Sequence, residues 1–311
     1  MSKAKTSVPS ITLVKTLAAH KKGISSLAIS LDRACLLSGG DDPVSIIWNL
    51  RTGENMQEIN CVFHGPVAAI TWIDLGAGDR KAFVFGCADG TLHLYWRGDI
   101  NSHFEFVSLT IAHDDGAVED IAYDPVHSRI ATAGGGTFTS LVLSPPKKKY
   151  ISKNIHFCDG GSSVIVYYLE SHEIVCYSVQ PWSLKWSKML PTRIGNANLG
   201  LNGKSLFVTN LLSGVDEYSF PSMERLQMFS HPVLRNFPLQ VCNVQDGLEG
   251  WVVVGGDDGY ARVFSQRTGQ LLMTRPHGND ELILIVSAYA DGNACLIATG
   301  SSNDGPSDIK I

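Results

Sequence analysis

Hydrophobic and polar residues alternate along most of the chain in short runs that turn residues separate. The clearest example lies between residues 24 and 61, where four alternating runs follow one another, at 24–29, 35–39, 44–48 and 55–61. Alternation with a period of two, bounded by Gly, Pro, Asn and Asp, predicts half-buried β-strands joined by tight turns. These residues are therefore expected to form a four-stranded antiparallel meander.

The same order of strands recurs along the chain. A second set is predicted at 67–73, 81–87, 91–96 and 104–111, and a third at 118–125, 129–133 and 138–143, with its fourth strand near 150–155. Self-similarity at such a period is the mark of a repeat architecture. The expected sets cover residues 19–61, 62–113, 114–155, 156–191, 192–230, 231–276 and 277–311, and no segment has a sustained helical period.

The period and the chain length together predict a ring of blades. His20 and His64 are 44 residues apart, and His231 and His277 are 46 apart, close to the roughly 40 to 45 residues of a four-stranded propeller blade. We therefore expect an all-β chain that forms a single domain, a seven-bladed β-propeller of four-stranded antiparallel blades. The last set has only three strands, so the alternating segment 10–18 is expected to add the outer strand beside residues 308–311 and close the ring.

Particular residues in the first two sets and in the sixth resemble the WD-repeat β-propeller family. That family places a His before the inner strand, Ser or Thr in the second strand, Asp in the tight turn and Trp in the third strand; His20, Ser38, Asp42 and Trp48 fit this pattern. The six-residue interval from Asp to an aromatic residue is kept by Asp89 and Tyr95 and by Asp258 and Phe264. The resemblance implies a structural role for these groups, hydrogen-bonded across each blade, rather than acid–base chemistry.

The sequence also departs from the family pattern. It contains no Gly-His and no Trp-Asp dipeptide, and the third to fifth sets lack the interval from Asp to an aromatic residue. Six or eight blades therefore remain alternatives to seven. An aromatic residue would directly follow Ile311 in the pattern, as expected of a chain cut short at this end.

Composition and charge exclude several classes of function. The chain has 311 residues with a net charge of -5, so broad binding of nucleic acid through a basic surface is not expected. No apolar stretch approaches the roughly eighteen residues of a membrane span, and no secretory signal is recognisable. Seven cysteines without a C-x-x-C pair indicate reduced thiols and a cytoplasmic or nuclear protein. The basic run 145–149 is either an import signal or, as we favour, a solvated loop.

Two short segments resemble cofactor-binding motifs, but the spacing of their residues does not fit those motifs. Gly203-Lys204-Ser205 resembles the end of a phosphate-binding loop, but Asn198 stands where its first glycine is required. The triplet 134–136 has Thr139 in place of the last glycine of a dinucleotide fingerprint. No cofactor and no metal are expected.

The function that fits best is a non-catalytic scaffold for protein–protein interaction, as the family resemblance implies. The loops that enter the inner strands share one face with the loops between the second and third strands, and loops on a rigid frame commonly carry binding residues. We expect that face to be mixed in charge but mostly acidic, and so to suit basic peptides or proteins, with the chain acting as a monomer or within a complex. The expected partner-binding residues are Lys21, Lys22, Asp41, Asp114, Asp115, Arg235, Asp257 and Asp280.

The alternative is a propeller enzyme, a lactonase-like hydrolase with a divalent metal in the central channel. Hard oxygen ligands from the inner strands would hold the ion. The candidate ligands are Glu119, Asp120, Asn196, Asn198 and Asn243. They come from only three of the sets, which weighs against convergence on one ion.

Overall fold

The computed structural model describes residues 12–76, 78–135, 150, 152–246, 249–278, 281–290 and 295–311. Apart from one 3-10 turn, η1 (Asp159–Gly161), all its regular elements are β-strands. None of the described elements is a helix long and apolar enough to cross a membrane.

Six four-stranded antiparallel sheets, here called blades, form most of the molecule. The first blade contains β2 (Ile24–Ile29), β3 (Cys35–Gly40), β4 (Val44–Asn49) and β5 (Asn55–Asn60). The second contains β6 (Val67–Ile73), β7 (Lys81–Cys87), β8 (Thr91–Arg97) and β9 (Glu105–Ile111). The third contains β12 (Ser152–Cys158), β13 (Ser163–Tyr168), β14 (Glu173–Ser178) and β15 (Ser183–Met189).

The remaining blades follow the same order. The fourth contains β16 (Asn196–Leu199), β17 (Ser205–Thr209), β18 (Gly214–Ser219) and β19 (Arg225–Ser230). The fifth contains β20 (Val241–Asp246), β21 (Glu249–Val254), β22 (Tyr260–Ser265) and β23 (Leu271–Pro276). The sixth contains β24 (Ile285–Ala290), β25 (Cys295–Gly300), β26 (Ser307–Lys310) and β1 (Thr16–His20), and a two-stranded sheet of β10 (Val118–Asp124) and β11 (Arg129–Gly134) lies between the second and third blades.

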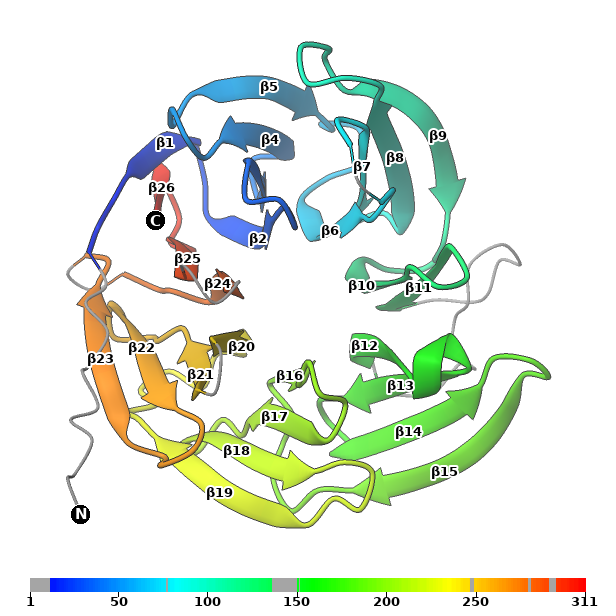
Figure 1. Ribbon diagram of the computed structural model, residues 1–311, viewed down its shortest axis with the longest axis vertical. Helices are drawn as coiled ribbons and strands as arrows, with labels where there is room; N and C mark the ends of the chain where they lie inside the picture. Colours follow the sequence, from blue (N-terminus) through cyan, green and yellow to red (C-terminus); the bar gives the residue numbers. More distant parts are fainter. Residues whose placement is uncertain are drawn as a thin grey trace.

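The sheets stand around a common centre, each with its first strand innermost (Figure 1). The inner strands β2, β6, β10, β12, β16, β20 and β24 contact one another in this order, and β24 also contacts β2. Short hairpins between successive antiparallel strands produce this arrangement, because each strand then pairs with its neighbour in the chain.

The N-terminal and C-terminal strands pair as the sequence predicts. β1 is antiparallel to β26, with Thr16 opposite Lys310 and Leu17 opposite Ile309. The strand begins at Thr16, later than the expected segment 10–18, of which residues 10 and 11 lie outside the described residues. Before it, the N–H groups of Val14 and Lys15 donate hydrogen bonds to the Ile311 carbonyl, at 2.7 and 3.3 Å.

The prediction of seven four-stranded blades is wrong for the described residues, which hold six such blades and one two-stranded sheet. The strand expected near 150–155 was assigned to the third set, but β12 pairs with β13 and is the inner strand of the following sheet. The boundary between sets 114–155 and 156–191 is therefore misplaced. The third strand expected at 138–143 lies outside the described residues.

The hydrophobic core is divided into layers between neighbouring sheets. One cluster joins Leu17 and Ile309 of the sixth blade to Ile24 and Trp48 of the first. Further clusters join each later sheet to the one before it. Alternating strands bury one face against each neighbour, so the sheets pack face to face like those of a sandwich.

An aromatic residue on the third strand of five blades takes part in this packing. In each of these blades it packs with apolar residues of the preceding sheet. These aromatic residues are Trp48, Tyr95, Tyr177, Tyr218 and Phe264.

Candidate functional site

His20, Ser38, Asp42 and Trp48 form one hydrogen-bond network in the first blade. His20 Nδ1 lies 3.0 Å from Asp42 Oδ1, and His20 Nε2 lies 2.8 Å from Ser38 Oγ. The indole N–H of Trp48 donates to Ser38 Oγ at 2.9 Å. Burial alone would raise the pKa of Asp42, but hydrogen bonds from His20 and from the backbone N–H of Lys21 outweigh it and hold the pKa below its usual range. His20 is buried, and its ring nitrogens are satisfied by these partners. The network connects the turn at Asp42 with β3 and β4, which is the structural role expected from the sequence.

The second blade has a modified version of this network. His64 Nδ1 lies 2.7 Å from Asp89 Oδ2, and the Thr91 hydroxyl donates to Asp89 Oδ1 at 2.6 Å. His93 occupies a position opposite Phe85, with its ring stacked at 4.8 Å, and its Nε2 lies 3.0 Å from Thr91 Oγ1. Burial, together with the neighbouring His64, lowers the pKa of His93 to about 4. His93 is therefore a neutral, packed imidazole at neutral pH.

The sixth blade contains a network that the sequence patterns did not reveal. His277 Nδ1 lies 2.9 Å from Thr299 Oγ1, and His277 Nε2 lies 2.7 Å from Asp308 Oδ1. Asp308 lies within β26, whereas Asp42 lies in the turn before β4. A search for Asp in the turn therefore could not find it.

In the fifth blade the interval from Asp258 to Phe264 is kept, but the partner of Asp258 is different. Arg262 donates two hydrogen bonds to the Asp258 carboxylate, at 3.0 and 2.5 Å. His231 Nδ1 instead lies 2.8 Å from the carbonyl of Pro232. Arg262 stands opposite Val254, the pair that corresponds in register to Ile46 and Ser38 of the first blade.

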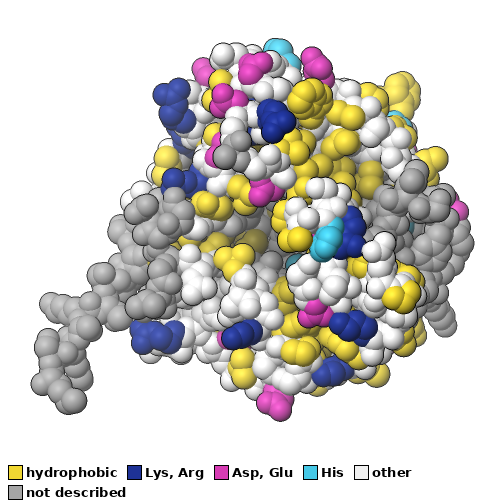
Figure 2. Space-filling view, turned by 45° about the vertical axis from the view of Figure 1, so that its right-hand side comes forward, with side chains coloured by type: hydrophobic (Ala, Val, Ile, Leu, Met, Phe, Trp, Pro, Cys, Tyr) yellow, Lys and Arg dark blue, Asp and Glu magenta, His cyan; other side chains and the backbone are white. Residues whose placement is uncertain are grey.

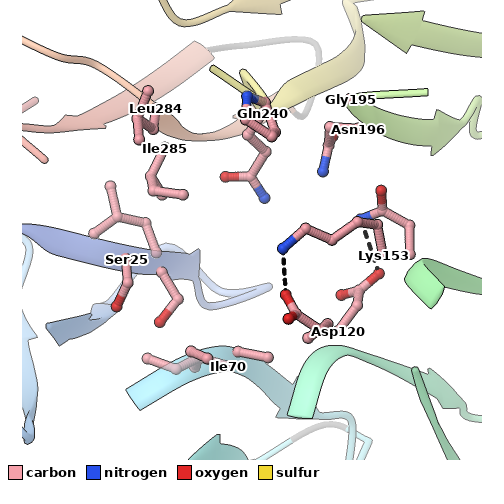
Figure 3. A pocket seen from close by; sticks show the side chains of 16 residues that line it. Ser25, Ile70, Asp120, Lys153, Gly195, Asn196, Gln240, Leu284 and Ile285 are labelled. Carbon is pink, nitrogen blue, oxygen red and sulfur yellow. Dashed lines mark hydrogen bonds and ion pairs between the residues drawn. The ribbon is translucent and has the colours of Figure 1, made fainter. Parts of the chain in front are cut away.

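A cavity of about 250 Å³ occupies the centre of the molecule (Figure 3). Residues of all seven inner strands, or of the segments just before them, line it. Lys153 extends into this space and is ion-paired with Glu119, while the side chains of Asn196 and Gln240 project toward it from the other side (Figure 3).

Polar side chains of the inner strands also join neighbouring sheets around this cavity. Each accepts a hydrogen bond from a backbone N–H of an adjacent inner strand. The pairs are Asp120 Oδ2 with Ile155 N at 3.0 Å, Asn154 Oδ1 with Ala197 N at 3.0 Å, Asn196 Oδ1 with Val241 N at 3.2 Å, Gln240 Oε1 with Val286 N at 3.1 Å, and Ser287 Oγ with Ile29 N at 3.2 Å. The inner strand is an edge strand, and these side chains satisfy N–H groups that its own sheet leaves free.

The residues considered as metal ligands already form hydrogen bonds or ion pairs within the protein. The carboxylate of Asp120 accepts hydrogen bonds through both oxygens, and the amide oxygens of Asn196 and Asn198 each accept a backbone N–H. Asn243 donates to the Trp251 carbonyl, and Glu119 is ion-paired with Lys153. Among the described residues, no group of three His, Cys, Asp or Glu side chains is placed to hold a metal ion. Glu119, Asp120, Asn196 and Asn198 thus connect neighbouring sheets, while the side chain of Asn243 bonds within the fifth blade.

The loops that enter the inner strands and the loops between second and third strands lie on one face, here called the loop face, because successive strands alternate in direction. The partner-binding residues predicted from the sequence fall on these loops. Exposed ones are Lys21, Lys22, Asp41, Asp114, Asp115 and Arg235, and Asp280 lies outside the described residues.

Asp257 differs from the others because it is 1% exposed. Its Oδ2 accepts hydrogen bonds from the N–H groups of Leu234 and Arg235, at 2.9 and 2.5 Å. Its carboxylate therefore positions the loop between the fourth and fifth blades, and Arg235 is placed on the surface by this contact.

Exposed apolar side chains are a feature of the loop face that the sequence analysis missed. Phe63 is 94% exposed and follows the exposed Val62, in the loop between β5 and β6. A second group lies on the loops of the fourth blade and comprises Leu212, Leu234 and Phe237. Figure 2 shows hydrophobic side chains between scattered charges of both signs over the surface in view. The sequence does contain a sign of this surface: Val62 and Phe63 are adjacent apolar residues outside any alternating run.

The comparison with known families agrees with this geometry. A family model described as WD domain, G-beta repeat matches residues 11–49, which include His20, Ser38, Asp42 and Trp48. No curated protein matches the chain. The matched repeat forms the outer strand of one blade and the first three strands of the next. Six four-stranded antiparallel blades stand around one centre, and this arrangement together with the matched repeat supports a WD-repeat β-propeller.

Proposed function

We propose that this protein is a scaffold that binds basic peptides or protein segments on its loop face. WD-repeat propellers generally serve as protein-interaction scaffolds. The observation that carries the proposal is the exposure of Phe63, because a large aromatic side chain held 94% exposed on a loop is typical of contact with another molecule.

The charge of the loop face supports a basic partner. Acidic side chains outnumber basic ones on the described loops of this face. The acidic residues are Asp41, Asp42, Asp89, Asp114, Asp115, Glu170, Asp257, Asp258, Glu281 and Asp304, and the basic ones are Lys21, Lys22, Arg193 and Arg235. On the described loops of the opposite face the numbers of acidic and basic side chains are nearly equal. Its acidic residues are Asp32, Glu54, Asp74, Asp79, Asp99, Asp159 and Glu224, and its basic ones are Lys15, Arg33, Arg51, Arg80, Lys204 and Arg267.

The carboxylate of Asp41 on the loop face is repelled by those of Asp304 and Asp42. Partial desolvation by its neighbours raises the pKa of the Asp41 carboxylate, and the negative charges of Asp304 and Asp42 raise it further, against the attraction of Lys22. A Lys or Arg side chain of a partner between Asp41 and Asp304 would relieve this repulsion. Basic partners are thus favoured electrostatically, while Phe63 supplies apolar contact area.

The experiment is affinity capture from cell extract followed by binding measurements with the purified partner. Phe63→Ser removes the exposed ring from the loop face. Leu201→Ser is the matched control, because Leu201 is 74% exposed on a loop of the opposite face. We expect Phe63→Ser to weaken binding at least about tenfold, which corresponds to roughly 1.4 kcal/mol, while Leu201→Ser leaves it unchanged. If Leu201→Ser weakens binding and Phe63→Ser does not, the interaction uses the opposite face and the proposal is wrong.

We also propose that the protein works in a reducing compartment, the cytoplasm or the nucleus. All seven cysteines are free thiols in the structure, and Cys35, Cys61, Cys87, Cys158 and Cys176 are buried. Imaging of the tagged protein in cells would test the location, and secretion into the medium would contradict it.

A further inference from the structure

The side-chain amides of Asn196 and Gln240 turn their NH₂ groups toward the central cavity. The oxygen of each amide accepts a backbone N–H of the next inner strand, from Val241 at 3.2 Å and from Val286 at 3.1 Å. Because the oxygens are held in this way, the nitrogens take the other position, and both side chains project toward the end of Lys153 (Figure 3). Neither NH₂ group has a hydrogen-bond partner among the described residues.

Lys153 and Glu119 complete a polar half of the cavity. The Lys153 ammonium group is ion-paired with Glu119 Oε2, and Glu119 Oε1 has no partner in the part of the chain that the structure describes. Asp120 adds a second carboxylate, but three N–H groups of β10 and β12 already donate to its oxygens. The polar half therefore presents N–H donors, one free carboxylate oxygen and, with two carboxylates and one ammonium group, a formal net charge of -1.

The other half of the cavity is apolar. Ile70 of the second blade, Ile285 of the sixth blade and Leu284 just before it line this half (Figure 3). The lining residues lie at the starts of the inner strands, which the loops of the loop face enter, so a ligand reaches the cavity from that face. A volume of about 250 Å³ holds about eight water molecules at about 30 Å³ each, and so a ligand of roughly that many non-hydrogen atoms.

We propose that the central cavity binds a free α-amino acid with a short apolar side chain. The carboxylate of the ligand accepts hydrogen bonds from Asn196, Gln240 and Lys153, and its ammonium group donates to Glu119 Oε1. Charges of opposite sign then alternate around the polar half, and a zwitterion adds no net charge to a cavity that already carries -1. The apolar side chain of the ligand lies in the apolar half, where it leaves water.

Simpler ligands satisfy this arrangement less well. A carboxylate without an amino group would add a negative charge beside Glu119 and Asp120. An amine without a carboxylate would leave the NH₂ groups of Asn196 and Gln240 without an acceptor in a partly desolvated site. The donors and the free oxygen are therefore both used only when one small molecule carries both groups.

Titration of the intact protein with apolar L-amino acids tests the proposal without any variant. With methyl-labelled protein, valine, leucine and methionine are expected to shift the methyl resonances of Ile70 and Ile285 in a saturable manner. Two analogues of leucine separate its charged groups: 4-methylpentanoate lacks the amino group, and 3-methylbutylamine lacks the carboxylate. Each should bind at least about tenfold more weakly than leucine. Absence of saturable shifts with all three amino acids at about 10 mM, or an analogue that binds as tightly as leucine, would overturn the proposal.

Two substitutions on β16 form a matched pair. Asn196→Asp keeps an oxygen for the N–H of Val241 but replaces the NH₂ group that faces the cavity by a negatively charged acceptor, so leucine binding should weaken at least about tenfold. Asn198→Asp makes the same chemical change where the amide oxygen accepts the N–H of Asn243, and Asn198 does not line the cavity. This control should bind leucine like the parent. Equal affinity of the two variants for leucine would contradict the assigned contact.

Two further variants keep the test independent of the folding of Asn196→Asp. Gln240→Glu makes the equivalent change beside β20 and should weaken leucine binding to a similar extent. Glu119→Gln removes the charge that faces the ligand's ammonium group, so leucine should bind more weakly and 4-methylpentanoate more tightly. If Glu119→Gln leaves both affinities unchanged, the zwitterion is excluded.

This inference goes beyond the proposed function, because it concerns a small molecule in the centre of the ring. Phe63→Ser, which tests the loop face, changes a residue that does not line the cavity and should leave leucine binding unchanged. Failure of the amino acids to bind overturns the cavity proposal and leaves the proposed function to be decided by its own partner-binding measurement.

Discussion

The carboxylate of Asp120 on β10 accepts the backbone N–H of Ile155 on β12, with a distance of 3.0 Å from Oδ2 to N. This contact joins the two-stranded sheet to the third blade at the wall of the central cavity. The side-chain oxygens of Asn154, Asn196 and Gln240 make equivalent bonds. Each accepts a backbone N–H from the inner strand of the following sheet. Neighbouring sheets are otherwise joined mainly by apolar side chains, so these bonds fix the height at which one inner strand lies beside the next.

Replacement of Asp120 by Ala should destabilise the fold. It removes the acceptor for the N–H groups of Ile121 and Ile155 and for the side-chain amide of Asn154. We expect the free energy of unfolding to fall by roughly 1 to 3 kcal/mol, the cost of buried donors left without a partner. Glu119→Gln is the control, since the partly exposed Glu119–Lys153 pair should contribute less than about 1 kcal/mol. Equal losses of stability in the two variants, measured by urea unfolding, would contradict the assigned role.

Replacement of Asp42 by Ala tests the network of the first blade. The change removes the carboxylate that holds His20 and the backbone N–H of Lys21, so about 1 to 3 kcal/mol of stability should be lost. Asp41→Ala is the neighbouring control and should not destabilise the protein, because partial desolvation and the repulsion from Asp304 and Asp42 already raise the pKa of Asp41. Thermal unfolding of both variants gives the comparison, and an unchanged melting temperature for Asp42→Ala would exclude the network as a source of stability.

The strands and the first network could be predicted from the sequence because both are encoded locally. Alternation over five to seven residues identified nearly every strand, and Ser38 and Trp48 follow at fixed intervals from the turn at Asp42. The assignment of β12 to the wrong sheet shows the limit of this signal. Period-two alternation predicts that residues form a strand, but it does not distinguish an inner strand from an outer one.

The candidate sites were predicted less completely, since their chemistry depends on contacts between distant parts of the chain. Asp120, Asn196 and Asn198 are recognisable in the sequence as polar residues on inner strands, but their side-chain oxygens accept N–H groups of the next inner strand. The side-chain amide of Asn243 donates to the Trp251 carbonyl of its own blade. The bond from His277 to Asp308 spans 31 residues and departs from the usual position of the Asp. Neither relationship follows from local spacing alone.

His93 should make the stability of the protein sensitive to acid. Burial lowers its pKa to about 4 from 6.5, so between these values the unfolded chain binds a proton that the folded protein does not. Stability therefore falls as the pH drops from 6.5 toward 4. In His93→Phe this contribution is absent, and the stability of the parent relative to the variant should decrease by at most about 2 kcal/mol between pH 7.5 and pH 5. Urea unfolding at both pH values measures it, and the other buried histidines cancel in the comparison; parallel pH profiles would mean that His93 takes up its proton equally well in the folded state.

Reversal of charge on the loop face should weaken the binding of a basic partner. The double variant Asp114→Lys, Asp115→Lys changes two exposed residues just before the inner strand β10, so folding should be preserved. Charges at the rim of an interface act mainly on the association rate, which should fall by about tenfold or more at low salt and recover toward the parent value at high salt.

The matched control is Glu54→Lys, Asp79→Lys, which makes the same change in net charge on loops of the opposite face. Stopped-flow or surface-based kinetics at several salt concentrations, with the captured partner, distinguish the two faces. Loss of association in the control as large as in the loop-face variant would mean that only the overall charge of the protein matters. Unchanged association of the loop-face variant at low salt would mean that Asp114 and Asp115 lie away from the partner, because two added positive charges within a Debye length of about 10 Å could not leave the approach of a basic surface unaffected.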